Sequence, residues 1–241
     1  MEKGTIQEIT FYSKFLEEHL ELFVYIPANY TPLNKYNTLI ASDGKDYFQL
    51  GGISHAADEL IENYEIENLI IIGIPYKDAL DRKRKYLPTG EKHEAYLKFL
   101  AHELVPFIDR EYSTTELSSC RGLIGDSMAA TVSLLAALKY PNIFGKVILQ
   151  SPYVDEHVLK IVEETETRES LMIYHTVGEQ ELKAITFYKE LKDFLTPNRK
   201  LHELLLAKNY QHMFYEELDG NHNWKAWKPD LKRALSKTFG I

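Results

Sequence analysis

The feature of this sequence that most limits its fold is the alternation of short apolar runs with longer amphipathic segments. The clearest run is Leu69-Ile70-Ile71-Ile72, which has no polar face and therefore suits a strand covered on both sides. Seven segments of this kind predict strands: Leu22–Ile26, Thr38–Ser42, Leu69–Ile74, Arg121–Gly125, Lys146–Gln150, Leu171–Thr176 and Met213–Leu218.

Between these runs, apolar residues recur every three or four positions, which places them on one face of a helix. The sets are Tyr96, Phe99, Leu100, Leu104, Phe107 and Ile108; Met128, Val132, Leu135 and Leu138; and Leu182, Ile185, Leu191 and Leu195. Strand–helix alternation predicts an α/β fold, a mostly parallel central sheet with helices on both faces. Because no repeat or linker interrupts it, we expect a single domain over residues 1–241. Ligands of such sheets bind beyond the carboxyl ends of the strands.

The composition is that of an ordinary globular protein, with 44% apolar and 27% charged residues. A net charge of -8 disfavours nucleic acid and anionic membranes as partners, because both are negative. No run approaches the roughly 20 apolar residues of a membrane span, and the start lacks a signal-peptide core, so we expect a cytoplasmic protein. The single cysteine, Cys120, excludes an intrachain disulfide and thiolate clusters. We expect no metal, because the histidines lack paired metal-binding spacing.

The segment from Leu123 to Ala130 carries the most chemical information. An apolar strand ends, a Gly125-Asp126-Ser127 turn follows, and a helix of small residues begins. This order is typical of a nucleophile elbow, in which a strained turn exposes a serine hydroxyl above the sheet. The usual pattern is Gly-x-Ser-x-Gly, so Ala129 adds one methyl group to the turn. Ser127 is predicted as the nucleophile; the alternative is that it only caps the helix.

A histidine and two carboxylates follow later strands. His222 lies in a Gly/Asn-rich turn after the last strand, where its imidazole is free to act as a general base. Glu179 and Glu181 follow the sixth strand, and either could accept the Nδ1 proton of the histidine. Glu181 is favoured, because its spacing after Gly178 suits a loop that turns back across the sheet. The other carboxylate would then lie at the start of a helix, where the helix dipole favours a negative charge. The chain order serine, carboxylate, histidine is that of α/β-hydrolases.

An oxyanion hole would complete such a site. The N–H of Met128, directly after the nucleophile, is one expected donor. The second is expected from the loop after an early strand, where we favour the N–H of Lys45 and where Gly44 would let the backbone approach a substrate. The alternative is that Asp43-Gly44 is only a turn.

These residues resemble the putative esterase family, which includes enterochelin-type siderophore esterases, esterase D-like enzymes and feruloyl esterases. The similar segments are Asp43–Phe48, Gly73-Ile74 with Arg82, Arg84, Tyr86 and Pro88, Glu103–Asp109, Tyr140–Gly145, and Ser151-Pro152. The resemblance implies an α/β-hydrolase fold with Ser127 as nucleophile, His222 as base and an acid after the sixth strand. The sequence departs from the family at Ala129-Ala130 and at Asn223, which leaves the substrate open.

Other residues are candidates for binding the substrate. Arg82 or Arg84 could hold an anionic group, since a guanidinium fork suits carboxylates; the alternative is a solvated basic loop. Asp43 and Tyr47, in the loop after the early strand, and Trp224, next to the histidine turn, are candidates to line the pocket; the alternative for Trp224 is that it docks the last helix on the core.

The sequence therefore predicts a serine carboxyl-ester hydrolase that uses a Ser127–His222–Glu181 triad and an acyl-enzyme. We expect no cofactor, because this acyl-enzyme chemistry requires none. The expected partner is a small-molecule ester, either a small acyl ester or a siderophore-like one. Three alternatives stay open: a non-catalytic interaction protein with this fold, acyl transfer to an acceptor other than water, and amide cleavage.

Overall fold

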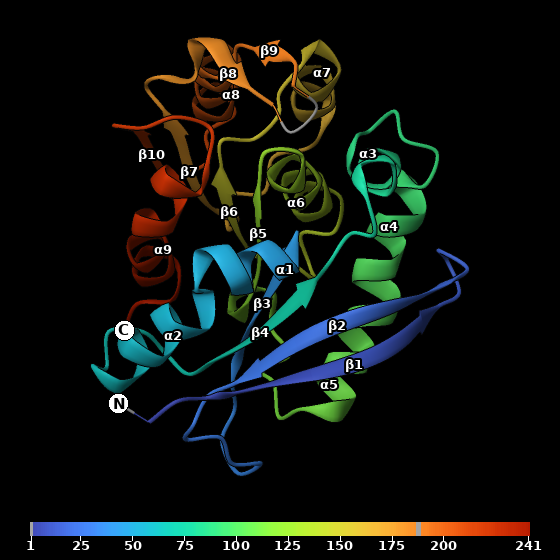
Figure 1. Ribbon diagram of the computed structural model, residues 1–241, viewed down its shortest axis with the longest axis vertical. Helices are drawn as coiled ribbons and strands as arrows, with labels where there is room; N and C mark the ends of the chain where they lie inside the picture. Colours follow the sequence, from blue (N-terminus) through green and yellow to red (C-terminus); the bar gives the residue numbers. More distant parts are fainter. Residues whose placement is uncertain (1, 187–188) are drawn as a thin grey trace.

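All seven predicted strands lie in one eight-stranded sheet (Figure 1). The computed structural model describes residues 2–186 and 189–241. The strand order is β1-β2-β4-β3-β5-β6-β7-β10. The bounds are β1 Thr5–Ser13, β2 Glu18–Ile26, β3 Asn37–Ser42, β4 Leu69–Ile74, β5 Arg121–Asp126, β6 Lys146–Gln150, β7 Met172–Gly178 and β10 Met213–Leu218.

The sheet is mostly parallel, as the alternation of strands and helices predicted. Strands β4, β3, β5, β6, β7 and β10 run parallel, whereas β1 and β2 are antiparallel to their neighbours. β1 was not predicted. It is an edge strand with most of its side chains exposed, so it needs no continuous apolar run.

Helices cover both faces of the sheet (Figure 1). The bounds are α1 Gly44–Asp46, α2 Ile53–Glu62, α3 Ala79–Tyr86, α4 His93–Phe99, α5 Val105–Glu111, α6 Met128–Lys139, α7 Glu156–Glu164, α8 Leu195–Ala207 and α9 Trp224–Phe239. The first apolar core packs α4 to α8 against one face, and the second packs α2 and α9 against the other. Successive strand residues serve opposite cores, since Leu39 lies in the second core and Ile40 in the first.

The prediction of a helix from Leu182 to Leu195 is wrong. The chain forms a 3₁₀ turn, η4 (Glu181–Lys183), and two short antiparallel strands, β8 (Ala184–Ile185) and β9 (Leu191–Lys192). The helix α8 begins only at Leu195. The side chains of Leu182, Ile185 and Leu191 are all exposed. Their helical spacing therefore has no apolar core to pack against, so these side chains would not stabilise a helix here. Residues 187 and 188 of the predicted helix lie outside the described residues.

Within those described ranges, no helix is long and apolar enough to cross a membrane.

Candidate active site

A strained turn presents Ser127 at the end of β5. Its backbone angles are φ 53° and ψ −123°, and α6 begins at the next residue. The Ser127 N–H donates to the Gln150 carbonyl at 3.0 Å, which anchors the turn to β6. Gly125 is required because a Cβ there would lie 2.2 Å from the Ala129 carbonyl carbon. Ala129 itself is accommodated and fully buried. The turn therefore depends on the glycine before the serine and tolerates alanine after it.

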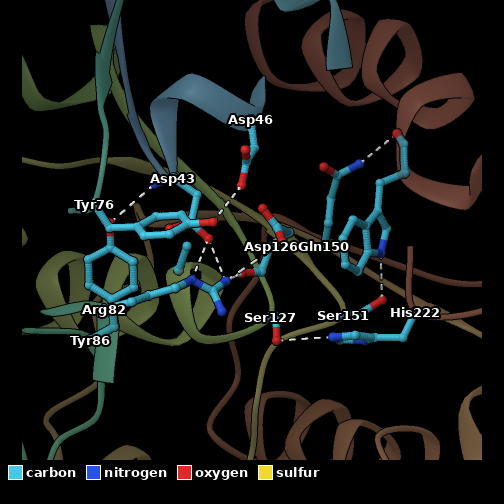
Figure 2. Close-up of polar contacts among 12 residues, drawn as sticks. Asp43, Asp46, Tyr76, Arg82, Tyr86, Asp126, Ser127, Gln150, Ser151 and His222 are labelled. Carbon is cyan, nitrogen blue, oxygen red and sulfur yellow. Dashed lines mark hydrogen bonds and ion pairs between the residues drawn. The ribbon is translucent and has the colours of Figure 1, made fainter. Parts of the chain in front are cut away.

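Ser127, His222 and Glu181 form one continuous hydrogen-bonded chain. The Ser127 Oγ lies 3.0 Å from the His222 Nε2, and the His222 Nδ1 lies 2.7 Å from the Glu181 Oε2. Figure 2 shows the first of these contacts. Glu181 has no exposed surface and contacts the imidazole, whereas Glu179 is exposed. The structure thus brings Glu181, and not Glu179, to the histidine.

Aromatic rings hold the imidazole of His222 in place. The Phe194 ring stacks on it with centroids 3.8 Å apart, and Trp227 meets it edge-on at 4.9 Å. Phe194, just before α8, was missed because nothing local in the sequence relates it to a histidine 28 positions later. The Asn223 side chain accepts the Lys225 N–H and caps α9, which explains the asparagine at this position.

A cavity of about 560 Å³ opens over the Ser127 hydroxyl. Its apolar wall consists mainly of Leu50, Met128, Ile185, Phe194, Trp224 and Trp227, and its polar wall includes Asp46, Tyr76, Arg82 and Asp126. Trp224 therefore lines the cavity and also packs against the second core. The expectation for Tyr47 needs correction, because this residue is fully buried behind Trp224. Its hydroxyl donates to Gln150 and its ring meets the indole edge-on at 5.0 Å, so it supports the wall from behind.

Arg82 lies on α3 and is held by two carboxylates (Figure 2). Its Nε donates to the Asp43 Oδ2 at 2.8 Å, and its Nη2 donates to the same oxygen and, at 3.3 Å, to the Asp126 carbonyl. The Asp126 carboxylate lies 3.8 Å from the Nη2. Asp43 is 1% exposed and does not line the cavity. It acts on the cavity through Arg82, which corrects its expected direct contact with the substrate.

The electrostatics of this cluster oppose the expected binding of an anion. Burial raises the pKa of Asp43, although the Arg82 guanidinium counteracts this effect. Burial, together with the charge of Asp43, holds the pKa of Asp126 well above its usual range. Burial disfavours the charge on Arg82, but the Asp43 carboxylate outweighs it and raises the pKa of the guanidinium. Arg82 therefore stays charged, with its charge balanced locally by Asp43.

The predicted oxyanion donors differ in how they meet the cavity. Met128 lines it and is the first residue of α6, so its N–H has no acceptor within the helix. Lys45 is not a lining residue, although the next residue, Asp46, is. Gly44 was expected to let the backbone approach a substrate. The structure gives a different reason for the glycine, since a Cβ there would lie 2.3 Å from the backbone of Gly73. It allows α1 to pack closely on β4.

Arg84 does not reach the cavity. Its side chain is half-exposed and forms an ion pair with Glu91. The anion-binding role considered for Arg84 from the sequence is therefore wrong, and its contact is an ion pair on the exposed side of α3.

Comparison with known proteins gives a consistent result. The sequence profile of the family described as "Putative esterase" matches residues 13–238. The uncharacterized protein YjcH of Bacillus subtilis (strain 168) is 50% identical over 234 residues, which cover 97% of each chain. Enterochelin esterase from Shigella flexneri superposes with a TM-score of 0.82 at 18% identity, over 97% of this chain and 57% of that one. A ferulic acid esterase superposes with a TM-score of 0.82 at 16% identity, over 99% of both chains.

This chain covers different shares of the two solved structures. The chain spans a little over half of the enterochelin esterase, 57%, and nearly all of the ferulic acid esterase, 99%. At these low identities, the superpositions show a shared α/β-hydrolase fold.

Proposed function

The chain belongs to the putative esterase family, and on that premise we propose that it is a serine carboxyl-ester hydrolase working through an acyl-enzyme. The observation that carries this proposal is the unbroken chain of contacts from Ser127 through His222 to Glu181, with the serine at the floor of a cavity. Nucleophile, base and orienting acid within hydrogen-bonding distance are what acyl transfer requires.

In the proposed mechanism, the Ser127 Oγ attacks the ester carbonyl carbon while the His222 Nε2 accepts its proton. Glu181 fixes the proton on Nδ1 and stabilises the imidazolium. The N–H of Met128, which lines the cavity, donates to the oxyanion of the tetrahedral intermediate. The N–H of Lys45 stays the proposed second donor, although Lys45 itself does not line the cavity. His222 then protonates the leaving alcohol, and the acyl group stays on the serine. Water, activated by the same histidine, releases the acid.

We propose two substrate classes for this cavity, small acyl esters and siderophore-like esters. The apolar wall around Trp224 suits an acyl group or an aromatic ring. We assign Arg82 to an uncharged oxygen of the substrate, such as a carbonyl or hydroxyl, because its charge is already balanced by Asp43. The hydrolysis rates of p-nitrophenyl acetate, p-nitrophenyl butyrate and a catecholate trilactone would separate these classes.

The experiment that tests the proposal compares ester hydrolysis by wild-type protein, Ser127→Ala and His222→Ala. Each substitution should lower kcat by several orders of magnitude, and the double variant should be scarcely worse, since triad residues act as a unit. Ser133→Ala is the matched control, because it removes a buried hydroxyl from α6, the helix that follows Ser127, where the hydroxyl donates to the Ala129 carbonyl. The control should keep wild-type turnover.

The alternatives correspond to other outcomes of the same experiment. No turnover above background by the wild-type protein, with any of the three esters, would favour the non-catalytic interaction protein. Trapping of an acyl group on Ser127, followed by release only to an added alcohol or amine, would favour an acyltransferase. Faster cleavage of the matching amide than of the ester would favour an amidase.

A further inference from the structure

Ser151, directly after β6, contacts the acid of the proposed triad. Its hydroxyl donates to the Glu181 Oε1 at 2.6 Å and accepts the indole N–H of Trp227 at 2.9 Å (Figure 2 shows the latter contact). The Gly178 N–H donates to the same glutamate oxygen at 2.8 Å. All of these groups are buried, and the serine is 1% exposed. The acid is therefore held on the side that faces away from His222.

The direction of each hydrogen bond in this network is fixed. An indole N–H can only donate, so the Ser151 Oγ must accept from Trp227. The single proton of the hydroxyl is then left for Glu181, which can only accept when ionised. With two donors on Oε1, the Oε2 atom is the one that remains for the His222 Nδ1 at 2.7 Å. The network thus selects which carboxylate oxygen meets the imidazole.

The backbone at Ser151 adds a second, independent argument. Its φ is 49°, in the left-handed region that favours glycine. A side chain is strained in this region, and the strain must be offset by the contacts that the side chain forms. The position therefore carries a hydroxyl where glycine would fit the backbone better. The two hydrogen bonds of this hydroxyl are the contacts that account for it.

We propose that Ser151 is a positioning residue for the triad: its hydroxyl, oriented by the Trp227 indole, holds the Glu181 carboxylate so that Oε2 faces His222. This role rests on the proposed function, in which the Glu181–His222 contact stabilises the imidazolium. Ser151 touches no reacting atom and acts only through the glutamate.

The test uses two substitutions in the full chain, Ser151→Gly and Ser151→Ala. The glycine variant removes the hydroxyl and relieves the backbone, so it should fold at least as well as the alanine variant. Both should lower kcat about tenfold or more, the effect of losing a hydrogen bond to a charged group, with KM within about twofold. Ser13→Ala is the matched control: Ser13 is also buried, donates to Glu103 and accepts an N–H, but lies at the end of β1.

A second readout does not depend on turnover. The proton between His222 and Glu181 should give a far-downfield ¹H NMR signal that disappears in His222→Ala. This signal should shift or broaden in Ser151→Gly and stay unchanged in Ser13→Ala. A glycine variant with wild-type kcat and an unmoved signal would overturn the positioning role. Loss of the proposed function would look different, since the wild-type protein itself would then lack turnover that depends on Ser127.

Discussion

Replacing Glu181 by glutamine should disable the site through the wrong tautomer of His222. The glutamate Oε1 accepts from the Ser151 hydroxyl and the Gly178 N–H, both of which are donors. In Glu181→Gln, the amide oxygen therefore stays on that side, and the amide NH₂ faces the His222 Nδ1. That nitrogen must then accept, so the ring proton moves to Nε2. The imidazole can no longer take the proton of Ser127.

The opposite orientation of the glutamine amide would also be costly. It would restore the productive tautomer but set the NH₂ group against two buried donors. Leaving each donor unsatisfied costs about 1–3 kcal/mol, or about 2–6 kcal/mol for the pair. The comparable substitution of a triad acid by its amide costs about 10⁴ in kcat, which corresponds to about 5.5 kcal/mol of transition-state stabilisation. We therefore expect Glu181→Gln to lose about three to four orders of magnitude in kcat.

The assay is steady-state hydrolysis of p-nitrophenyl butyrate at several pH values, with Glu179→Gln as the matched control. Glu179 is exposed two positions away, so its variant should keep turnover within about twofold of wild type, as expected of a surface change. The reasoning fails if Glu181→Gln retains more than about a tenth of the wild-type kcat. It also fails if the two variants exchange their effects.

Two further predictions concern stability. Gly125→Ala places a Cβ 2.2 Å from the Ala129 carbonyl carbon, so it should lower the free energy of unfolding by at least about 1–3 kcal/mol in urea titrations; an unchanged midpoint would contradict the close packing of the turn. Asp126→Asn should stabilise the fold at neutral pH, because burial and Asp43 raise the pKa of this carboxyl in the folded chain. The folded state then binds the proton more tightly than the unfolded state, so wild-type stability falls as pH rises above the ordinary value of 3.8 and through the folded pKa. Unfolding free energies measured across pH should show a smaller fall in the variant, and equal slopes would refute this account.

The sequence by itself determined most of the sheet and the order of the candidate site residues along the chain. Seven strands, β2 to β7 and β10, were predicted from their apolar residues, since a strand buried on both faces, such as β4, leaves a continuous apolar run in the sequence itself. The elbow around Ser127 was predictable because a strand, a tight turn and a helix of small residues are local features. His222 followed from its position after the last strand, since parallel strands bring their carboxyl ends to one edge of the sheet.

Only the tertiary structure decided which side chains meet there. The sequence favoured Glu181 over Glu179 only through its spacing after Gly178, whereas in the structure the Ser151 hydroxyl and the Gly178 N–H hold the Glu181 carboxylate. The charge of Arg82 is balanced by Asp43, 39 residues away.

The same limit explains the two structural errors. The spacing of Leu182, Ile185 and Leu191 resembles a helix, but the fold leaves these side chains exposed. The exposed edge strand β1 leaves no apolar run to detect. Periodicity records how a segment could be buried, whereas contacts between distant segments determine whether it is, and those contacts exist only once the chain has folded.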